Sequence, residues 1–376
     1  MKKLLMGLLI FAFAINLTAC GNLKNSNLTN NPANTNGKQK TYQTTVTDKN
    51  GYNVLLKDGQ YLISPTNGIT ASNNDNNVDN RSLEVGLLNI SHDLFSTDKY
   101  VFQEGQVLTP RQVNIWLSRY SKHNKQGLNY KKSKKYSPII LNQIFEQDFL
   151  VKSGSSYKLG GISLGLALNS VDYYTKVKDG PEYHVNIKKN QQLAYGKKVA
   201  YTLIKRLRKI SALKHIPILI GLFQKTGRDS LIGGNYLAYS IVDTNSSKIN
   251  EWKSVDYSSQ VLPTIGDTKP INSTDAASFS DFKAAIQGYF PNISGVIAKV
   301  HYQNKHLKQM NISITTQFYG YAQIESFSRL TLSVAKKYLP NNVPIEIRIE
   351  SVNNLQATIT KNDADDSYYV HVFSGE

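Results

Sequence analysis

Cys20 is the residue best suited to covalent chemistry, because it is the only cysteine of the 376-residue chain and directly follows an oily leader in the string "INLTACGN". A cysteine thiolate is a nucleophile, so a lone one at this place can accept a lipid group. With no second thiol available, the chain forms no internal disulfide, and its folded part must depend on an apolar core.

Residues 1–19 have the composition of a secretory signal peptide. Lys2 and Lys3 form a positive start, and no charge follows up to Ala19. This run includes Asn16 and is shorter than the ~20 apolar residues of a spanning helix. Leu-Thr-Ala-Cys resembles the bacterial lipobox, so we expect cleavage between Ala19 and Cys20 and a diacylglyceryl group on the sulfur. The alternatives are a plain secretory signal with a chance cysteine, or an uncleaved anchor.

Two further groups have residue types suited to acid–base or nucleophilic chemistry. Ser91, His92 and Asp93 are adjacent on an expected helix, whereas a catalytic triad needs groups that converge from different directions. Glu146 and Asp148 in "FEQDF" are two residues apart, and on the helix expected there they would point to different sides. Neither group is therefore predicted to be catalytic, and the acids are expected to cap or form salt bridges.

The string "LNSVDYY" gives the candidate ligand-binding residues Asn169, Asp172, Tyr173 and Tyr174. They lie just beyond an expected buried strand, where α/β arrangements often place ligands. A tyrosine offers a flat apolar face and a polar tip, which suits contact with a carbohydrate or a peptide. The alternative is a packed loop whose hydroxyl groups are satisfied internally.

Motifs for metals and cofactors are missing from the sequence. The seven histidines are scattered and form no His-Glu-x-x-His pair, and no phosphate loop or dinucleotide fingerprint occurs. We therefore predict no metal, no cofactor and no enzymatic activity.

The chain is strongly basic, with a formal net charge of +17, or +15 without Lys2 and Lys3. Such an excess favours anionic partners, here an anionic envelope polymer or a host glycan. Export and the lack of an aromatic-studded binding motif argue against nucleic acid. Surface lysines that simply keep the protein soluble are the alternative. The basic residues gather in three strings, "YKKSKKYS", "IKKN" and "KRLRK" (Lys131, Lys132, Lys134, Lys135, Lys188, Lys189, Lys205, Arg206, Arg208, Lys209).

Hydrophobic patterning predicts two strand–helix–strand units in the part after the leader. In the first unit, strands at 160–170 and 216–225 flank a helix at about 193–210. In the second, strands at 310–318 and 343–351 flank a helix at about 323–338. Each opening strand follows an expected hairpin partner. We interpret the two units as copies of one α+β unit.

The predicted fold class is therefore α+β, with two tandem related β-α-β units and N-terminal helical and hairpin extensions on the first. The expected extensions are a hairpin at Asp58-Gly59, a polar loop at 75–82, and helices from Leu83, from Thr109-Pro110 and from Ser137-Pro138. The predicted parts are a lipoprotein signal peptide (1–19), a disordered Asn-rich tether (20–50), a first α+β domain (51–260) and a second (275–376), joined by a polar connection at 258–278.

Several strings resemble the CamS family of Gram-positive sex pheromone lipoproteins: "GLLNISHDLFSTDKYVFQEGQ", "LNQIFEQDF", "GLALNSVDYY", "KDGPEY" and "FYGYAQIE … PIEIRI". The resemblance implies a cell-surface lipoprotein whose cleaved leader is trimmed to a short hydrophobic mating signal. Phe13–Ala19, "FAINLTA", occupies the place of that peptide. Asn16 departs from its apolar pattern, and burying the amide unpaired costs about 1–3 kcal/mol, which argues against activity of this segment.

The leading functional hypothesis is a lipid-anchored extracellular protein whose leader yields a signalling peptide and whose folded body binds something at the envelope without catalysis. The alternatives are a hydrolase that acts on wall material, and a cationic adhesin for anionic polymers or glycans.

Overall fold

The computed structural model describes residues 42–45, 51–72, 76–133, 136–289, 293–351, 354–362 and 367–374. The predicted signal peptide, with Ala19 and Cys20, and most of the predicted tether lie outside these residues. None of the described helices is long and apolar enough to span a membrane.

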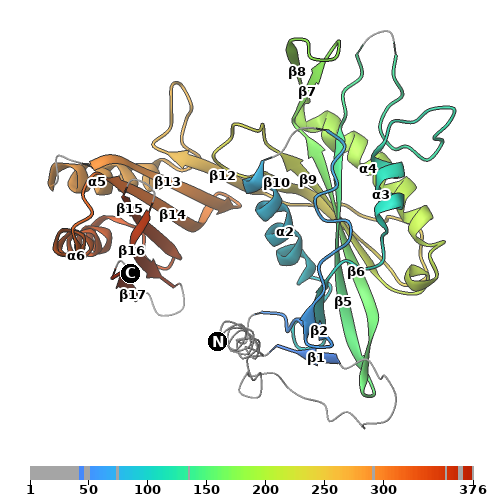
Figure 1. Cartoon of the computed structure of the whole chain (residues 1–376), viewed down its shortest axis with the longest axis horizontal. Coiled ribbons are helices and arrows are strands. Elements are labelled where there is room, and N and C mark those ends of the chain that lie inside the picture. Colours follow the sequence, from blue (N-terminus) through green and yellow to red (C-terminus); the bar gives the residue numbers. More distant parts are fainter. Residues whose placement is uncertain are drawn as a thin grey trace, which may run out of the picture.

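Two six-stranded mixed sheets with attached helices make up most of the described chain (Figure 1). We call the part around the first sheet the first body (51–256) and the part around the second sheet the second body (257–374). The first sheet has the order β11-β10-β9-β6-β5-β4, from strands β4 (Val101–Glu104), β5 (Leu141–Ser153), β6 (Ser156–Asn169), β9 (Ile218–Lys225), β10 (Asn235–Val242) and β11 (Lys253–Ser254).

The second sheet repeats this topology. Its order is β12-β13-β14-β15-β16-β17, from β12 (Tyr257–Leu262), β13 (Ile293–Gln303), β14 (His306–Thr316), β15 (Ile345–Ser351), β16 (Asn354–Lys361) and β17 (Tyr368–Val372). In each sheet one central pair is parallel, β6–β9 or β14–β15, and every other pair is antiparallel. A crossover helix, α4 (Lys189–Leu207) or α6 (Tyr321–Tyr338), joins the parallel strands. The predicted α+β class and both strand–helix–strand units are confirmed.

Helices cover the first sheet on both faces. Helix α3 (Pro110–Leu117) and α4 pack on one face, and α2 (Asn77–Ser91) packs on the other. Strand β6 shows why, because its even positions from Ile162 to Leu168 are large and face α4, whereas its odd positions are small. At Gly165 a Cβ would lie 2.5 Å from the hydroxyl of Tyr236, so only glycine lets α2 and the Tyr236 ring approach.

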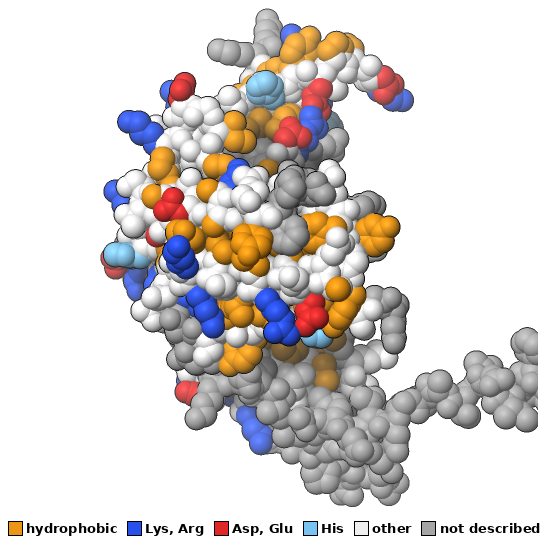
Figure 2. Space-filling view, turned by 90° about the vertical axis from the view of Figure 1, so that its left-hand side faces the viewer, with side chains coloured by type: hydrophobic (Ala, Val, Ile, Leu, Met, Phe, Trp, Pro, Cys, Tyr) orange, Lys and Arg blue, Asp and Glu red, His pale blue; other side chains and the backbone are white. Residues whose placement is uncertain are grey.

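The second sheet carries its helices on one face. Buried residues of α5 (Ser273–Tyr289) and α6, such as Phe282 and Phe327, pack against the alternating buried positions of β13 to β16. Figure 2, which looks onto the molecule from the side of the second body, shows hydrophobic side chains scattered among charged and polar ones.

Two small sheets complete the fold. Strands β2 (Leu55–Lys57) and β3 (Gln60–Tyr61) form the hairpin predicted at Asp58-Gly59, and both turn residues have positive φ. Strand β1 (Tyr42–Thr44) pairs with β2, which corrects the prediction of a disordered tether up to residue 50. Strands β7 (Val171–Thr175) and β8 (Glu182–Asn186) form a second hairpin that follows β6 directly.

Three other local predictions are wrong. The polar stretch 75–82 is not a loop, because α2 begins at Asn77 and the Asn76 side chain caps it by accepting the Val78 N–H. The helix expected from Ser137-Pro138 is strand β5 instead. The connection expected at 258–278 contains most of β12 and the start of α5, so β12, partly assigned to the first domain, belongs to the second sheet. The capped helix at Thr109-Pro110 is confirmed as α3.

Candidate functional site

The parallel strands β6 and β9 end side by side at a buried polar cluster. Asn169 and Lys225, the last residues of the two strands, are register partners and are 0% and 1% exposed. The Lys225 ammonium donates to Asn142 Oδ1 at 3.1 Å, and Asn142 Nδ2 donates to Ser72 Oγ at 2.8 Å. Asn169 Nδ2 donates to the same Ser72 Oγ at 3.0 Å. The cluster therefore ties three strands to the segment before α2.

Asp79 of α2 holds the loop that follows β9. Its carboxylate accepts hydrogen bonds from the Thr226 amide (3.1 Å) and from the Gly234 amide (2.7 Å). Burial raises the pKa of Asp79, while these donors and the charge of Lys225 oppose the rise. The group thus fixes the 226–234 loop next to the β7–β8 hairpin.

Asn169 and Asp172, two of the predicted ligand-binding residues, meet around Ile139. Asn169 donates to the Ile139 carbonyl at 3.0 Å, and Asp172 accepts the Ile139 N–H at 2.8 Å and the Tyr136 hydroxyl at 2.6 Å. Burial raises the pKa of Asp172. Its other oxygen, Oδ1, is buried and has no hydrogen-bond partner among the described residues. Both side chains hold the segment before β5 in place.

Tyr174 lies in a row of aromatic rings with a cation at each end. Its ring stacks on Tyr136 with 3.5 Å between centroids and 10° between planes, and Tyr183 follows at 5.7 Å. Arg119 lies 5.9 Å from the Tyr136 centroid, and the Lys176 ammonium lies 4.3 Å from that of Tyr183. Because the rings cover one another, the row offers ring edges and hydroxyl groups to a ligand.

Tyr173 lies on the opposite side of the same hairpin, as neighbours on a strand must. The guanidinium of Arg228 lies 4.1 Å from its ring centroid and forms an ion pair with Glu182. The structure therefore brings Asn169, Asp172 and Tyr174 together and separates Tyr173 from them. That these four residues bind a ligand stays a prediction.

Glu146 and Asp148 form a buried acid pair that the sequence reasoning missed. On strand β5, residues two apart share a face, whereas the expected helix would have separated them. Glu146 accepts the amides of Val107 (3.2 Å) and Leu108 (3.0 Å), and Asp148 accepts that of Gln106 (2.9 Å). Burial raises the pKa of both acids, and the charge of Glu146 raises that of Asp148 further. Through these hydrogen bonds the pair holds the turn between β4 and α3 in place.

The adjacent residues Ser91, His92 and Asp93 do not converge. The Ser91 hydroxyl donates to the Leu87 carbonyl, the His92 ring contacts Tyr52 edge-on, and Asp93 accepts the Tyr239 hydroxyl. Among the described residues, no group of three His, Cys, Asp or Glu side chains is arranged to hold a metal ion.

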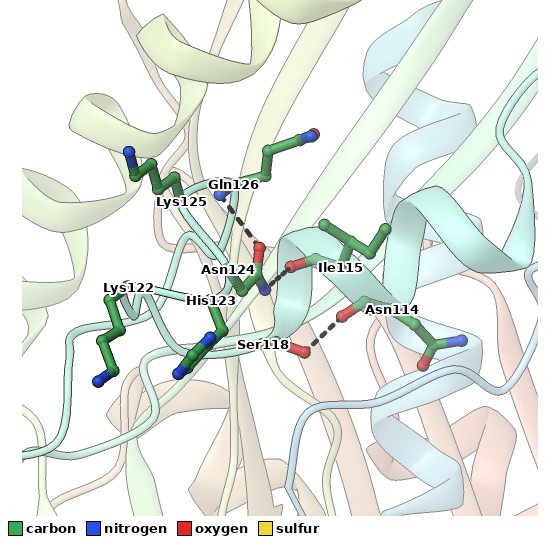
Figure 3. A pocket seen from close by; sticks show the side chains of 8 residues that line it. All are labelled: Asn114, Ile115, Ser118, Lys122, His123, Asn124, Lys125 and Gln126. Atoms are coloured by element: carbon green, nitrogen blue, oxygen red, sulfur yellow. Dashed lines mark hydrogen bonds between the residues drawn. The ribbon is translucent and has the colours of Figure 1, made fainter.

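An open pocket of about 590 Å³ lies at the end of α3 (Figure 3). The side chain of Asn124 shapes it by donating to the Ile115 carbonyl at 2.9 Å and accepting the Gln126 amide at 3.1 Å. Its lining includes Lys122, His123 and Lys125, and its chemistry favours anions.

The fold, two tandem α+β units, is similar to that of known proteins. The family model described as CamS sex pheromone cAM373 precursor matches residues 61–367. The chain belongs to this family.

Two solved structures are similar along most of their length. The sex pheromone precursor from Lactobacillus salivarius subsp. salivarius UCC118 shares 35% identity, with a TM-score of 0.83 over 89% of this chain and 100% of that one. The C-terminal domain of the sex pheromone staph-cAM373 precursor from Staphylococcus aureus shares 28% identity, with a TM-score of 0.66 over 79% of this chain and 97% of that one. A search of curated proteins found no match.

Proposed function

We propose that this chain is a lipid-anchored sex pheromone precursor, exposed on the outer face of the cell membrane, whose body is a non-enzymatic envelope-binding module. The observation that carries the proposal is the family match over residues 61–367. The leader supports it, because Cys20 follows a positive start and an apolar run and can take up a diacylglyceryl group.

The anchor is tested by the Cys20→Ser variant in cells. We expect it to move from the membrane fraction to the medium and to lose incorporation of labelled fatty acid. Thr18→Ser is the matched control, because it changes the same motif and keeps the thiol. Membrane retention or labelling of Cys20→Ser equal to that of the control would contradict the anchor.

The signalling role is tested with synthetic peptides on responsive enterococci. If "FAINLTA" is the active peptide, it provokes aggregation at nanomolar doses. Absence of aggregation at micromolar doses would contradict a signalling role for this segment. The matched peptide "FAIILTA" replaces Asn16 with isoleucine. If the receptor buries this side chain, relief of the about 1–3 kcal/mol amide penalty lowers the effective dose roughly 5- to 150-fold.

A wall hydrolase is the alternative for the body, and Glu146 with Asp148 is the acid pair on which it would depend. The pair is buried and bound to backbone amides of the turn after β4. Turnover of purified wall fragments by the wild-type chain, abolished by Asp148→Asn, would favour the hydrolase over the binding module.

A further inference from the structure

The positive charge of the chain is confined to its first part. Residues 51–256 contain 28 Lys and Arg against 16 Asp and Glu, whereas residues 257–376 contain 10 of each kind. Two segments account for the excess. Residues 105–145 contain eight Lys and Arg, and residues 183–228 contain eleven. Neither segment contains an Asp or Glu.

The fold brings these two segments together on one side of the first sheet, where α3 and α4 lie (Figure 1). Arg206 of α4 donates to the Gln126 carbonyl at 2.7 Å, and its guanidinium lies 5.9 Å from the Trp116 ring centroid. The Tyr195 hydroxyl donates to the Leu128 carbonyl. The pocket of Figure 3 therefore lies beside α4.

Two arginines on this side, Arg119 and Arg208, hold backbone segments together, whereas the described lysines of the two segments, apart from the buried Lys225, lie at the surface. Arg119 donates to two backbone carbonyls and Arg208 to four, so their guanidinium groups are occupied. We define the basic face by five exposed lysines of these segments (Lys122, Lys125, Lys198, Lys205, Lys209). At 1.5 Å rise per residue, Lys198 and Lys205 lie about 10 Å apart on one stripe of α4.

Tyrosine is the only large hydrophobic residue type exposed in the two segments among the described residues (Tyr120, Tyr130, Tyr136, Tyr183, Tyr201). Tyr201 lies on the stripe between Lys198 and Lys205, and the Lys205 ammonium is 5.5 Å from its ring centroid. A surface that inserts into a bilayer exposes Leu, Phe or Trp beside its cations. Tyrosines with polar tips instead suit a hydroxylated chain in water.

We propose that the basic face binds a phosphodiester-linked polyol or sugar polymer of the cell envelope. This inference rests on the proposed function and adds its ligand class and its surface. A lysine ammonium is a point charge that can donate to phosphate oxygens in many directions, whereas arginine suits planar bidentate partners. A row of lysines therefore fits repeated monoanionic phosphates on a flexible chain. An acidic protein or a lipid surface fits it less well, because no apolar anchor accompanies the charge.

The test measures binding of soluble poly(glycerol phosphate) to the chain after the leader, with Cys20→Ser, over a range of NaCl concentrations. One variant carries Lys198→Gln, Lys205→Gln and Lys209→Gln. The control carries Lys308→Gln, Lys336→Gln and Lys337→Gln, which removes the same charge from exposed positions of the second body. With the coefficient of a single-stranded polyanion, losing three phosphate contacts lowers the salt slope by about 2 and the affinity at 0.15 M salt about fiftyfold.

We expect that loss in the first variant, binding within about twofold of wild type in the control, and unchanged unfolding curves in both. Equal losses in both variants would show that net charge alone attracts the polymer and would overturn the basic face. Binding to phosphatidylglycerol vesicles or to a sulfated glycan, without binding to the polymer, would overturn the ligand class, as would no binding at low salt.

The readouts separate this inference from the proposed function, because the binding assay uses a chain without the anchor. Polymer binding by a chain that proves to be unlipidated in cells would leave the inference standing and remove the anchor. A chain that is lipidated in cells but does not bind the polymer would keep the anchor and overturn the inference.

Discussion

Asp148→Asn should make the first body more stable at neutral pH. In the folded chain, burial and the neighbouring Glu146 charge raise the pKa of Asp148 well above the usual 3.8. As pH rises between the unfolded and the folded pKa, the unfolded chain releases this proton first. The free energy of unfolding then falls by up to about 1.4 kcal/mol per pH unit. The loss is complete above the folded pKa.

The asparagine side chain of the Asp148→Asn variant does not titrate, and its shape fits the site. In the variant, the side-chain amide oxygen can accept the Gln106 N–H that Asp148 Oδ2 accepts at 2.9 Å. We therefore expect variant and wild type to be similar near pH 4, and the variant to gain with rising pH. A displacement of one pKa unit already gives about 1.4 kcal/mol at pH 8.

Glu146→Gln is the matched contrast. In the wild type, one carboxylate oxygen of Glu146 accepts the Val107 N–H and the other accepts the Leu108 N–H. The glutamine side chain has only one acceptor oxygen. One buried N–H loses its partner, so this variant should be about 1–3 kcal/mol less stable than Asp148→Asn throughout.

The assay is urea unfolding from pH 4 to pH 8, followed by the fluorescence of Trp116 and Trp252. These are the two tryptophans of the chain, and both lie in the first body. Taking the difference between variant and wild type removes the contributions of other buried acids with raised pKa values, such as Asp79. An Asp148→Asn chain that is less stable than wild type at pH 8, or a difference that does not change with pH, would refute the reasoning.

Three further predictions concern contacts that hold the first body together, each measured as a change in the free energy of unfolding. Tyr136→Phe removes the hydroxyl that Asp172 accepts and should cost about 1–3 kcal/mol; no loss would show that the bond contributes nothing. Arg208→Lys removes a guanidinium group that donates to four backbone carbonyls, and it should lower the free energy of unfolding by about 2–4 kcal/mol. Unchanged stability would mean that water replaces these hydrogen bonds. Gly221→Ala places a Cβ 2.5 Å from a tyrosine ring and should cost about 1–3 kcal/mol, while Gly288→Ala in α5, with open space around it, should be neutral or stabilising; equal effects would contradict the packing argument.

The sequence predicts the framework well where a sheet is covered on one face or a helix has a clear cap. Strand β14 alternates buried and less buried positions along "MNISITT", and Thr109 with Pro110 marks the start of α3. In these places the local pattern and the tertiary environment agree, so the periodicity alone identifies the element.

Strand β5 shows where the periodicity misleads. Its large apolar residues Leu141, Phe145 and Phe149 are four apart, which is the spacing of one helix face. The strand is buried on both faces, with Phe145 and Phe149 toward α2 and Leu141 toward α4. Five of the positions between these residues hold buried polar side chains (Asn142, Gln143, Glu146, Gln147, Asp148), so the alternation of a half-buried strand does not form there.

The same burial hides the acid pair from sequence analysis. Glu146 and Asp148 become neighbours only on a strand, and their partners are backbone amides of the turn at 106–108. Every residue type except proline has a backbone N–H, so the sequence does not indicate which amides will donate to these acids. Only the tertiary fold shows the contact. The polar cluster likewise joins Asn142 and Asn169 of the β5–β6 hairpin to Lys225 of β9, which follows only after α4 in the chain.

The repeated topology makes the charge of α4 informative about function. Helix α6 occupies the same place in the second body, yet it carries three Lys and Arg with one Glu, whereas α4 carries five Lys and Arg and no acid. Both helices bury an apolar face on a parallel strand pair. The fold at this position therefore works without a cationic outer face. Lys197 and Lys205 each contact an aromatic ring, Trp252 and Tyr201, but these contacts do not remove the mutual repulsion of the clustered charges. The charge of α4 is therefore not required by the fold, which is consistent with the proposed polymer-binding face.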